Sequence, residues 1–296
     1  MTSRVHLALG AALFAPTLLI AQPRLIDAFD STSAWTAVPS EGASATIALA
    51  DGQTGRALAL EFELTRTYSY AIARCDLVTP LELPEDFRFT FDLRAETAVN
   101  NFEFKLVDEH DNVWWQRRLD FAYPRDWTRQ SIRRRHLTLA WGPQPQAPLR
   151  RVKSIELVIS AGNGGRGRLL VDNLRFEGFD ARVAAAAQAR VSVSSAAPGG
   201  EPSCDRAGNL TKPWRFAPGD TAPQLTLDFG VSREIGGVML EWAAGAFAAA
   251  YDVQLSDDGV AWTTVGTVTA GNGGRDWLYL PDQQGRALRL VLDPGV

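Results

Sequence analysis

The 296-residue chain is mildly acidic, since 34 Asp and Glu residues against 30 Lys and Arg residues give a formal net charge of -4. This balance gives no electrostatic reason to expect a nucleic acid or an anionic membrane surface as a partner. With 25 Gly, 16 Pro and 9 Trp, and few long stretches of helical periodicity, the composition predicts an all-β protein of short strands joined by turns.

The first residues are typical of a signal peptide. Arg4 precedes an apolar run from Leu7 to Ile20, which is followed by Ala21 and the helix-breaking Gln22-Pro23. The run is too short to span a membrane with any margin. We therefore predict a signal peptide over residues 1–21, cleaved after Ala21, no membrane insertion, and a secreted or periplasmic protein.

Residues 25–179 contain a series of segments in which apolar and polar residues alternate. A period of two predicts strands that bury one face in a sandwich core. The stretch is long enough to build a core of its own. The clearest of these segments are Arg56–Leu64, Phe87–Leu93, Asn101–Val107 and Ser154–Ile159.

Three motifs give this stretch a family likeness. It opens with Phe29-Asp30 near Trp35, it closes with Val171-Asp-Asn-Leu-x-Phe176, and between them runs Phe104-Lys-Leu-Val-Asp-Glu-His-Asp-Asn-Val-Trp-Trp115. In these motifs it resembles the jelly-roll carbohydrate-binding modules found beside polysaccharide-degrading catalytic domains. The resemblance implies a galactose-binding-like β-sandwich over residues 25–179 that binds a polysaccharide or an oligosaccharide.

An Ala-rich stretch separates this part of the chain from the next one. We predict a linker over residues 180–188, because its composition suits a short helical turn or a compact connection. Apolar residues alternate again in Leu225–Phe229 and Tyr251–Leu255, and Asp257-Asp258-Gly259 supplies a hairpin turn before Trp262. Residues 189–296 are therefore predicted to form a second β domain.

The second domain has sharper family signatures. They are Val191–Ser195, Asp205-Arg-Ala-Gly-Asn-Leu-Thr-Lys-Pro-Trp214 and Ser256-Asp-Asp-Gly-x-x-Trp262. This order resembles the discoidin domain, or coagulation factor five/eight type C domain, which implies a second galactose-binding-like jelly roll that binds and does not catalyse. The family continues beyond the strand Leu288–Leu292 into one more strand. We therefore expect a domain truncated at its C-terminus, with an unpaired sheet edge.

Sugar binding requires an aromatic face that stacks on a pyranose ring, with polar side chains beside it. In the first domain the candidates are Trp114, Trp115, Arg117 and Tyr123. Adjacent residues of a strand point to opposite faces, so one of the two tryptophans is expected in the core and the other at the surface. The remaining tryptophans of this domain are assigned to core or rim packing, namely Trp35, Trp127 and Trp141.

Calcium is the cofactor that the two resemblances imply. Both families often hold a structural calcium between the N-terminal loop and the last strand. Carried over by position, the first domain would use Asp30 with Asp172, and the second would use Asp205, Asn209 and Thr211. Carboxylates at loops suit this ion, but Asp and Asn also cap turns without any metal. Both interpretations stay open.

The two cysteines, Cys75 and Cys204, permit one disulfide in an exported protein. They fall in different predicted domains, and a bridge requires Cα atoms within roughly 7 Å. Two separately buried thiols are the favoured interpretation.

Catalysis within these residues is not expected. Glu103, Asp108, Glu109 and Asp111 are available, but no spacing places two of them beside an aromatic cleft as glycosidases require. Two functions remain in contention. The chain is a glycan-binding region that targets a missing catalytic domain to polysaccharide, or it is a structural or adhesive module that binds a protein or cell-surface partner.

Overall fold

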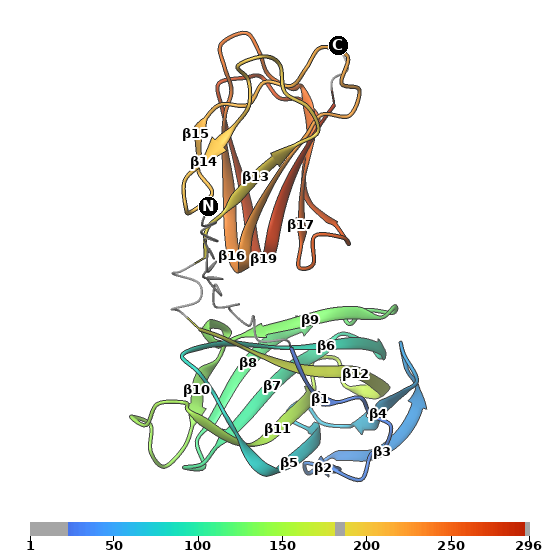
Figure 1. Cartoon of the computed structure of the whole chain (residues 1–296). Helices are drawn as coiled ribbons and strands as arrows, with labels where there is room; N and C mark the ends of the chain where they lie inside the picture. Colours follow the sequence, from blue (N-terminus) through green and yellow to red (C-terminus); the bar gives the residue numbers. More distant parts are fainter. Residues whose placement is uncertain (1–22, 181–186, 294–296) are drawn as a thin grey trace, which may run out of the picture. The chain divides into compact units, whose positions relative to one another are not determined.

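The computed structural model describes residues 23–180 and 187–293, which belong to two compact units (Figure 1). We call residues 23–180 the N-terminal unit and residues 187–293 the C-terminal unit. Apart from the short 3-10 helix η1 (Arg134–His136), the regular elements of the described residues are β-strands, which confirms the predicted all-β class. The predicted signal peptide and most of the predicted linker lie outside the described residues.

The N-terminal unit is built from two antiparallel sheets of six strands each (Figure 1). In the first sheet the order is β3-β4-β12-β6-β9, and β1 also pairs with β12. Its strands are β1 (Arg24–Asp27), β3 (Ala43–Asp51), β4 (Arg56–Leu64), β6 (Asp86–Glu96), β9 (Thr128–Arg133) and β12 (Gly165–Phe179). In the second sheet the order is β10-β8-β7-β11-β5-β2. Its strands are β2 (Trp35–Pro39), β5 (Tyr70–Glu82), β7 (Asn100–Asp108), β8 (Val113–Phe121), β10 (Thr138–Trp141) and β11 (Arg151–Ser160).

Aromatic side chains fill the core between these two sheets. Every second residue of β6 and of β7 points inward, and the inward phenylalanines are fully buried. Phe91 of β6 stacks on Phe104 of β7, with ring centroids 5.9 Å apart and ring planes 11° from parallel. Phe89 also contacts Phe104, at 5.3 Å between centroids. The alternation in the sequence therefore sorts each strand into a core side and an outward side.

The C-terminal unit contains one antiparallel sheet of five strands in the order β13-β16-β19-β17-β18, together with a two-stranded ribbon. Leu288, Leu290 and Leu292 pack in its core beside Tyr251 and Val253. The strands of the sheet are β13 (Arg190–Val193), β16 (Gln224–Glu241), β17 (Ala250–Ser256), β18 (Thr263–Val268) and β19 (Arg275–Asp293). The ribbon consists of β14 (Ser203–Cys204) and β15 (Leu210–Lys212).

One prediction about this sheet is wrong. Residues Leu288–Leu292 were expected to lie at an unpaired edge, but they belong to β19, which pairs with β16 on one side and β17 on the other. Leu288 faces Leu227 of β16 and Leu255 of β17. The backbone groups of this segment are therefore satisfied within the sheet, because β16 and β17 supply both partners.

The cysteines are separate thiols, as favoured from the sequence. Cys75 is buried on β5, and this burial, together with the nearby carboxylates Asp27 and Asp76, raises the pKa of its thiol to about 11. Cys204 lies on β14 and is partly exposed, so the burial predicted for its thiol is wrong. In the part of the chain that the structure describes, no helix has the length and apolar character needed to cross a membrane.

Candidate ligand-binding site

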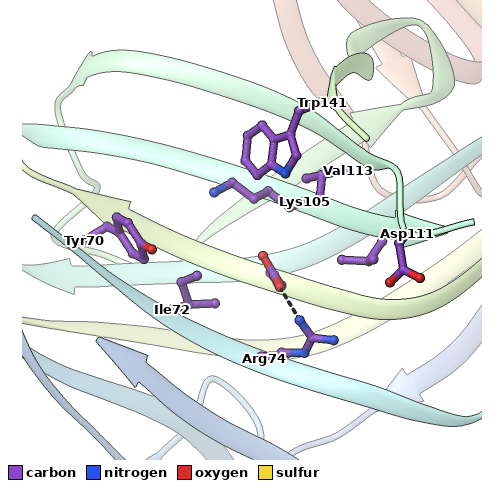
Figure 2. A pocket seen from close by; sticks show the side chains of 9 residues that line it. Tyr70, Ile72, Arg74, Lys105, Asp111, Val113 and Trp141 are labelled. Atoms are coloured by element: carbon purple, nitrogen blue, oxygen red, sulfur yellow. Dashed lines mark hydrogen bonds and ion pairs between the residues drawn. The ribbon is translucent and has the colours of Figure 1, made fainter. Parts of the chain in front are cut away.

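A cleft opens on the outward face of the second sheet of the N-terminal unit (Figure 2). Its volume is about 350 Å³. Strands β5, β7 and β11 form its floor, and β10 and the β7–β8 turn form one wall. The residues that line this cleft, which we call the β5–β10 cleft, are Tyr70, Ile72, Arg74, Lys105, Val107, Asp111, Val113, Trp141 and Glu156.

The register of the sheet places opposite charges side by side across the floor. Glu156 of β11 lies between Arg74 of β5 and Lys105 of β7, and Lys105 in turn faces Trp115 of β8. The Arg74 Nη1 atom is 3.0 Å from the Glu156 Oε1 atom (Figure 2). Both Lys105 and Glu156 are buried, which a charged side chain tolerates only when it is paired.

Aromatic rings surround the Lys105 ammonium group. The Nζ atom lies 5.3 Å from the ring centroid of Trp141, 5.7 Å from that of Trp115 and 5.9 Å from that of Tyr70. The Trp115 and Trp141 rings meet edge to face at 5.6 Å. A cation over an aromatic face is attracted by the ring quadrupole, so Lys105 helps to fix the rings that flank it. Trp141 and Tyr70 stand on either side of the lysine with 52% and 39% of their surface exposed.

The charges around the cleft occur in balanced ion pairs. Glu103 accepts from Lys105 at 2.9 Å and from Arg117 at 3.2 Å. Arg74 contacts a second carboxylate, that of Asp76, at 2.9 Å. With the Lys153–Asp111 pair at 2.6 Å, four cations face four carboxylates, namely Arg74, Lys105, Arg117 and Lys153 against Asp76, Glu103, Asp111 and Glu156. The cleft therefore offers many hydrogen-bond donors and acceptors without a net charge.

A buried polar network holds the wall that carries Trp141. Asp108 accepts hydrogen bonds from the backbone N–H groups of His110 and Asn112, the Asn112 side chain and the Trp114 indole. The Asn112 side chain also accepts from the Gln144 N–H at 3.0 Å and donates to the Gln144 carbonyl at 2.9 Å. Because Gln144 follows Trp141 by three residues, these contacts fasten the end of β10 to the β7–β8 turn.

The structure separates the four sugar-contact residues predicted from the sequence. Trp114 is the core member of its pair, and its indole N–H donates to Asp108. Trp115 is on the outward face, partly exposed, with the Arg117 guanidinium 5.4 Å above its ring centroid. The predicted split of the two tryptophans between opposite faces is therefore confirmed, and Trp115 and Arg117 lie beside the cleft.

Tyr123 does not belong to the rim of a binding platform. Its side chain is buried against Phe102 and Phe121, and its hydroxyl donates to the Asn101 carbonyl at 3.0 Å. Burial raises the pKa of this phenol further above its usual value. The predicted surface role is wrong for Tyr123, because this residue lies just beyond the end of β8 at Phe121 and its side chain packs into the core.

Most of the residues that line the cleft come from strands whose pairing the amino-acid sequence does not reveal. Trp141 was assigned to packing, yet half of its surface is exposed at the cleft wall. Trp35, by contrast, is buried as predicted. The outward-pointing side chains of β5 and β11 include Tyr70, Arg74 and Glu156. Only the register of the sheet brings them beside Lys105.

The calcium ligands implied for the first domain border one loop. Asp172 is fully buried, and its carboxylate accepts from the backbone N–H of Thr54 at 3.0 Å and from that of Asn173 at 2.6 Å. A Cβ on Gly52 would lie 2.8 Å from Asp172 Oδ2, and one on Gly55 would lie 4.0 Å from Asp30 Oδ1. Asp30 and Asp172 therefore flank the turn between β3 and β4.

The residues implied for the second domain are hydrogen-bonded within a turn. Asp205 Oδ1 accepts from the N–H groups of Ala207, Gly208 and Asn209, and Oδ2 accepts from the Asn209 side chain. These bonds, the one from the Asn209 side chain first, lower the pKa of Asp205. The Thr211 hydroxyl lies 2.9 Å from that of Ser203. Asp205 is thus a turn-capping residue, and no cluster of three or more His, Cys, Asp or Glu side chains suited to a metal occurs among the described residues.

The sequence of the C-terminal unit matches a known domain family. Residues 190–294 match the family model of the F5/8 type C domain. This part of the chain is an F5/8 type C domain. It contains β13 to β19, including the Ser256–Trp262 turn, in which Asp258 accepts from Ser256, Val260 and Ala261. No curated protein matches the chain.

Several solved structures are similar to the chain that carries this F5/8 type C domain. A family 11 carbohydrate-binding module from Clostridium thermocellum, in complex with a β-1,3-1,4-mixed-linked tetrasaccharide, is 17% identical. The match covers 53% of this chain and 95% of the module, with a TM-score of 0.46. Chitosan-binding module 1 from a chitosanase/glucanase of Paenibacillus sp. IK-5 is 31% identical. That match covers 36% of this chain and 84% of the module, with a TM-score of 0.33.

Proposed function

We propose that this chain is a non-catalytic glycan-binding region and that the β5–β10 cleft holds a segment of a polysaccharide or oligosaccharide. The observation that carries the proposal is the pair of exposed rings, Tyr70 and Trp141, on either side of a floor of paired charges. Aromatic faces stack on the C–H faces of pyranose rings, and the floor supplies partners for hydroxyl groups. The ion pairs hold these partners in place before a ligand arrives.

The charge balance supports an uncharged chain as ligand. An anionic polysaccharide would have to displace Glu103 or Glu156 from their cations, and the repulsion from the remaining carboxylates would oppose it. A neutral sugar needs no such exchange. Because two rings and a shallow floor bury little area, we expect micromolar-to-millimolar affinity, which is useful mainly when several contacts act together.

Replacing Tyr70 or Trp141 by Ala tests the cleft directly. Each change should weaken binding of soluble neutral glycans by about tenfold, since loss of one stacked ring removes about 1.4 kcal/mol or more. The measurement is retardation in gels that contain mixed-linkage β-glucan, glucomannan or hydroxyethyl cellulose. Tyr68→Ala is the matched control, because Tyr68 is exposed two residues away and does not line the cleft.

The same gels test the charge argument. Hydroxyethyl cellulose and carboxymethyl cellulose share a backbone but differ in charge, so we expect retardation by the neutral polymer and little by the anionic one. If the Tyr70 and Trp141 variants keep an intact fold and are retarded as strongly as the wild type across the panel, the result would favour the alternative function, an adhesive module that binds a protein or cell-surface partner.

The wider setting of the chain belongs to this proposal as well. A glycan-binding region with an F5/8 type C domain suits a secreted or periplasmic protein in which it keeps a catalytic domain on its polysaccharide. The sequence pattern of residues 1–21 supports export. The alternative role, in which the F5/8 type C domain binds a protein or cell-surface partner, predicts binding that is independent of Tyr70 and Trp141.

We also propose a structural calcium ion at Asp30 and Asp172. The support is the position of both carboxylates at the β3–β4 turn and the burial of Asp172. Such an ion would tie the start of the N-terminal unit to β12.

A further inference from the structure

The C-terminal unit exposes two aromatic rings on one face of its sheet. Trp277 and Tyr279 of β19 are 74% and 82% exposed, and Met239 of β16 is 48% exposed. Residues two apart on a strand point to the same side, about 6.6 Å from one another along the strand. Their neighbours Leu278 and Leu280 pack in the core, so the aromatic residues are not needed to fill it.

The strand register turns these residues into a continuous platform. Met239 faces Trp277 and Gly237 faces Tyr279, while Glu241 faces Arg275 at the next pair. Gly237 has no side chain to compete with the Tyr279 ring for space, and a Cβ there would lie only 2.7 Å from the Leu278 carbonyl oxygen. We call Gly237, Met239, Trp277 and Tyr279 the β16–β19 platform.

Charge decides which kind of partner fits this platform. The polar pair at its end is an ion pair, with Arg275 Nη2 3.2 Å from Glu241 Oε1, so the two charges cancel. A polyanion or polycation would find no net opposite charge there, whereas a neutral chain could stack on the rings and hydrogen-bond to the exposed guanidinium and carboxylate. Exposed rings grouped in this way are typical of interaction sites.

We propose that the β16–β19 platform is a second glycan-binding site, which takes the surface of an uncharged, insoluble polysaccharide. It differs from the β5–β10 cleft in shape, because its rings lie open on one sheet face and touch a ligand from one side only. A cleft encloses a single soluble chain, while an open face of two rings suits chains that are already packed side by side. This inference does not rest on the cleft, since the residues belong to another unit.

The test uses the full chain and two insoluble powders, microcrystalline cellulose and chitin. The Trp277→Ala/Tyr279→Ala variant should lose at least tenfold in retention on one or both powders and keep its retardation by soluble glycans. The Tyr70→Ala/Trp141→Ala variant should show the reverse pattern, so failure of either site is seen separately. Phe247→Ala is the control, because Phe247 is 45% exposed in the same unit and lies outside the platform.

Two results would overturn the proposal. One is equal retention of wild type and the Trp277→Ala/Tyr279→Ala variant on both powders, with unchanged melting of both proteins. The other is a wild-type dimer in sedimentation velocity that this variant converts to a monomer without loss of retention, which would make the platform an interface between copies of the chain. Trp277→Phe, which keeps an aromatic ring, should retain most of the binding.

Discussion

Single carboxylates organise the binding face of the N-terminal unit. Glu103 bridges Lys105 and Arg117, and Asp108 collects four hydrogen bonds at the turn that leads to the cleft wall. Burial alone would raise the pKa of Asp108, but the bonds from Trp114, Asn112 and His110 together lower it. The ionised form is therefore the one that the folded state prefers.

Replacing Asp108 by Asn should make the protein less stable at pH 7 by roughly 1–3 kcal/mol, because buried donors lose their charged acceptor. A lowered folded pKa gives stability that is complete above the unfolded value near pH 4 and is lost as the pH falls through the folded value. The wild type should therefore lose its advantage over Asp108→Asn on acidification from pH 5 towards pH 2. Urea unfolding at several pH values measures this difference.

The exposed Asp126 provides the control for that series. Asp126→Asn should track the wild type at every pH. A wild-type advantage over Asp108→Asn that stays constant down to pH 2 would contradict the role given to the ionised Asp108 carboxylate.

At the scale of strands and turns, the sequence predicted the alternation well and the pairing poorly. The period of two in Asn101–Val107 correctly puts Phe102 and Phe104 in the core and Lys105 on the outward side. It says nothing about which strand lies beside β7, because register is set by contacts between segments far apart in the chain. Arg74 and Glu156 therefore share the cleft only because β5 and β11 lie next to one another in the sheet.

Positions just beyond a clear period were the hardest to predict. Tyr123 lies just beyond the end of β8 and Trp141 is the last residue of β10, where a bulge or turn changes the side to which a residue points. The register of β10 on β8 shifts between Leu139 and Trp141, which is one such irregularity. Proximity in sequence to Trp115 was the wrong criterion for Tyr123, and Trp141 reaches the cleft from a separate strand.

The β3–β4 turn provides a prediction at the same scale. If calcium binds Asp30 and Asp172, it should raise the melting temperature of the N-terminal unit by several degrees, since a ligand of the folded state stabilises it by mass action. Differential scanning calorimetry with 2 mM calcium chloride or EDTA, concentrations on the order of those used for weak calcium sites, checks this shift.

Two variants sharpen the calcium experiment. Asp172→Asn should abolish the difference between calcium and EDTA, whereas Asp205→Asn, at a turn already saturated by N–H donors, should leave it intact. Identical melting curves of the wild type in the two solutions would argue against an ion at this turn.

On the scale of the whole molecule, each unit has a hydrophobic cluster of its own. The N-terminal cluster is rich in phenylalanine, and the C-terminal one consists mainly of leucine and other aliphatic residues, together with Phe229 and Tyr251. Separate cores permit each unit to fold by itself, so the domain boundary predicted from the Ala-rich composition can be tested by experiment.

Limited proteolysis should cut between Asp180 and Ala189 and release two folded pieces. Calorimetry of the uncut chain should then show two transitions. Leu290→Ala should lower the melting temperature of only one of them, because Leu290 packs in the C-terminal core and its loss should cost that unit roughly 2–5 kcal/mol of unfolding free energy. A single transition that Leu290→Ala shifts as a whole would mean that the two units unfold together.

The central place of β19 has a consequence for the order in which the chain is made. β16, β17 and β18 all leave the ribosome before β19, yet β19 lies between β16 and β17 and pairs with both (Figure 1). Until it emerges, the nascent chain presents two strands with open hydrogen-bonding edges and an uncovered apolar face, which are the features that chaperones recognise and that lead to aggregation. The N-terminal unit precedes it in the chain and is free to fold during synthesis. The C-terminal unit should therefore be most prone to aggregation in the interval before β19 has been synthesised.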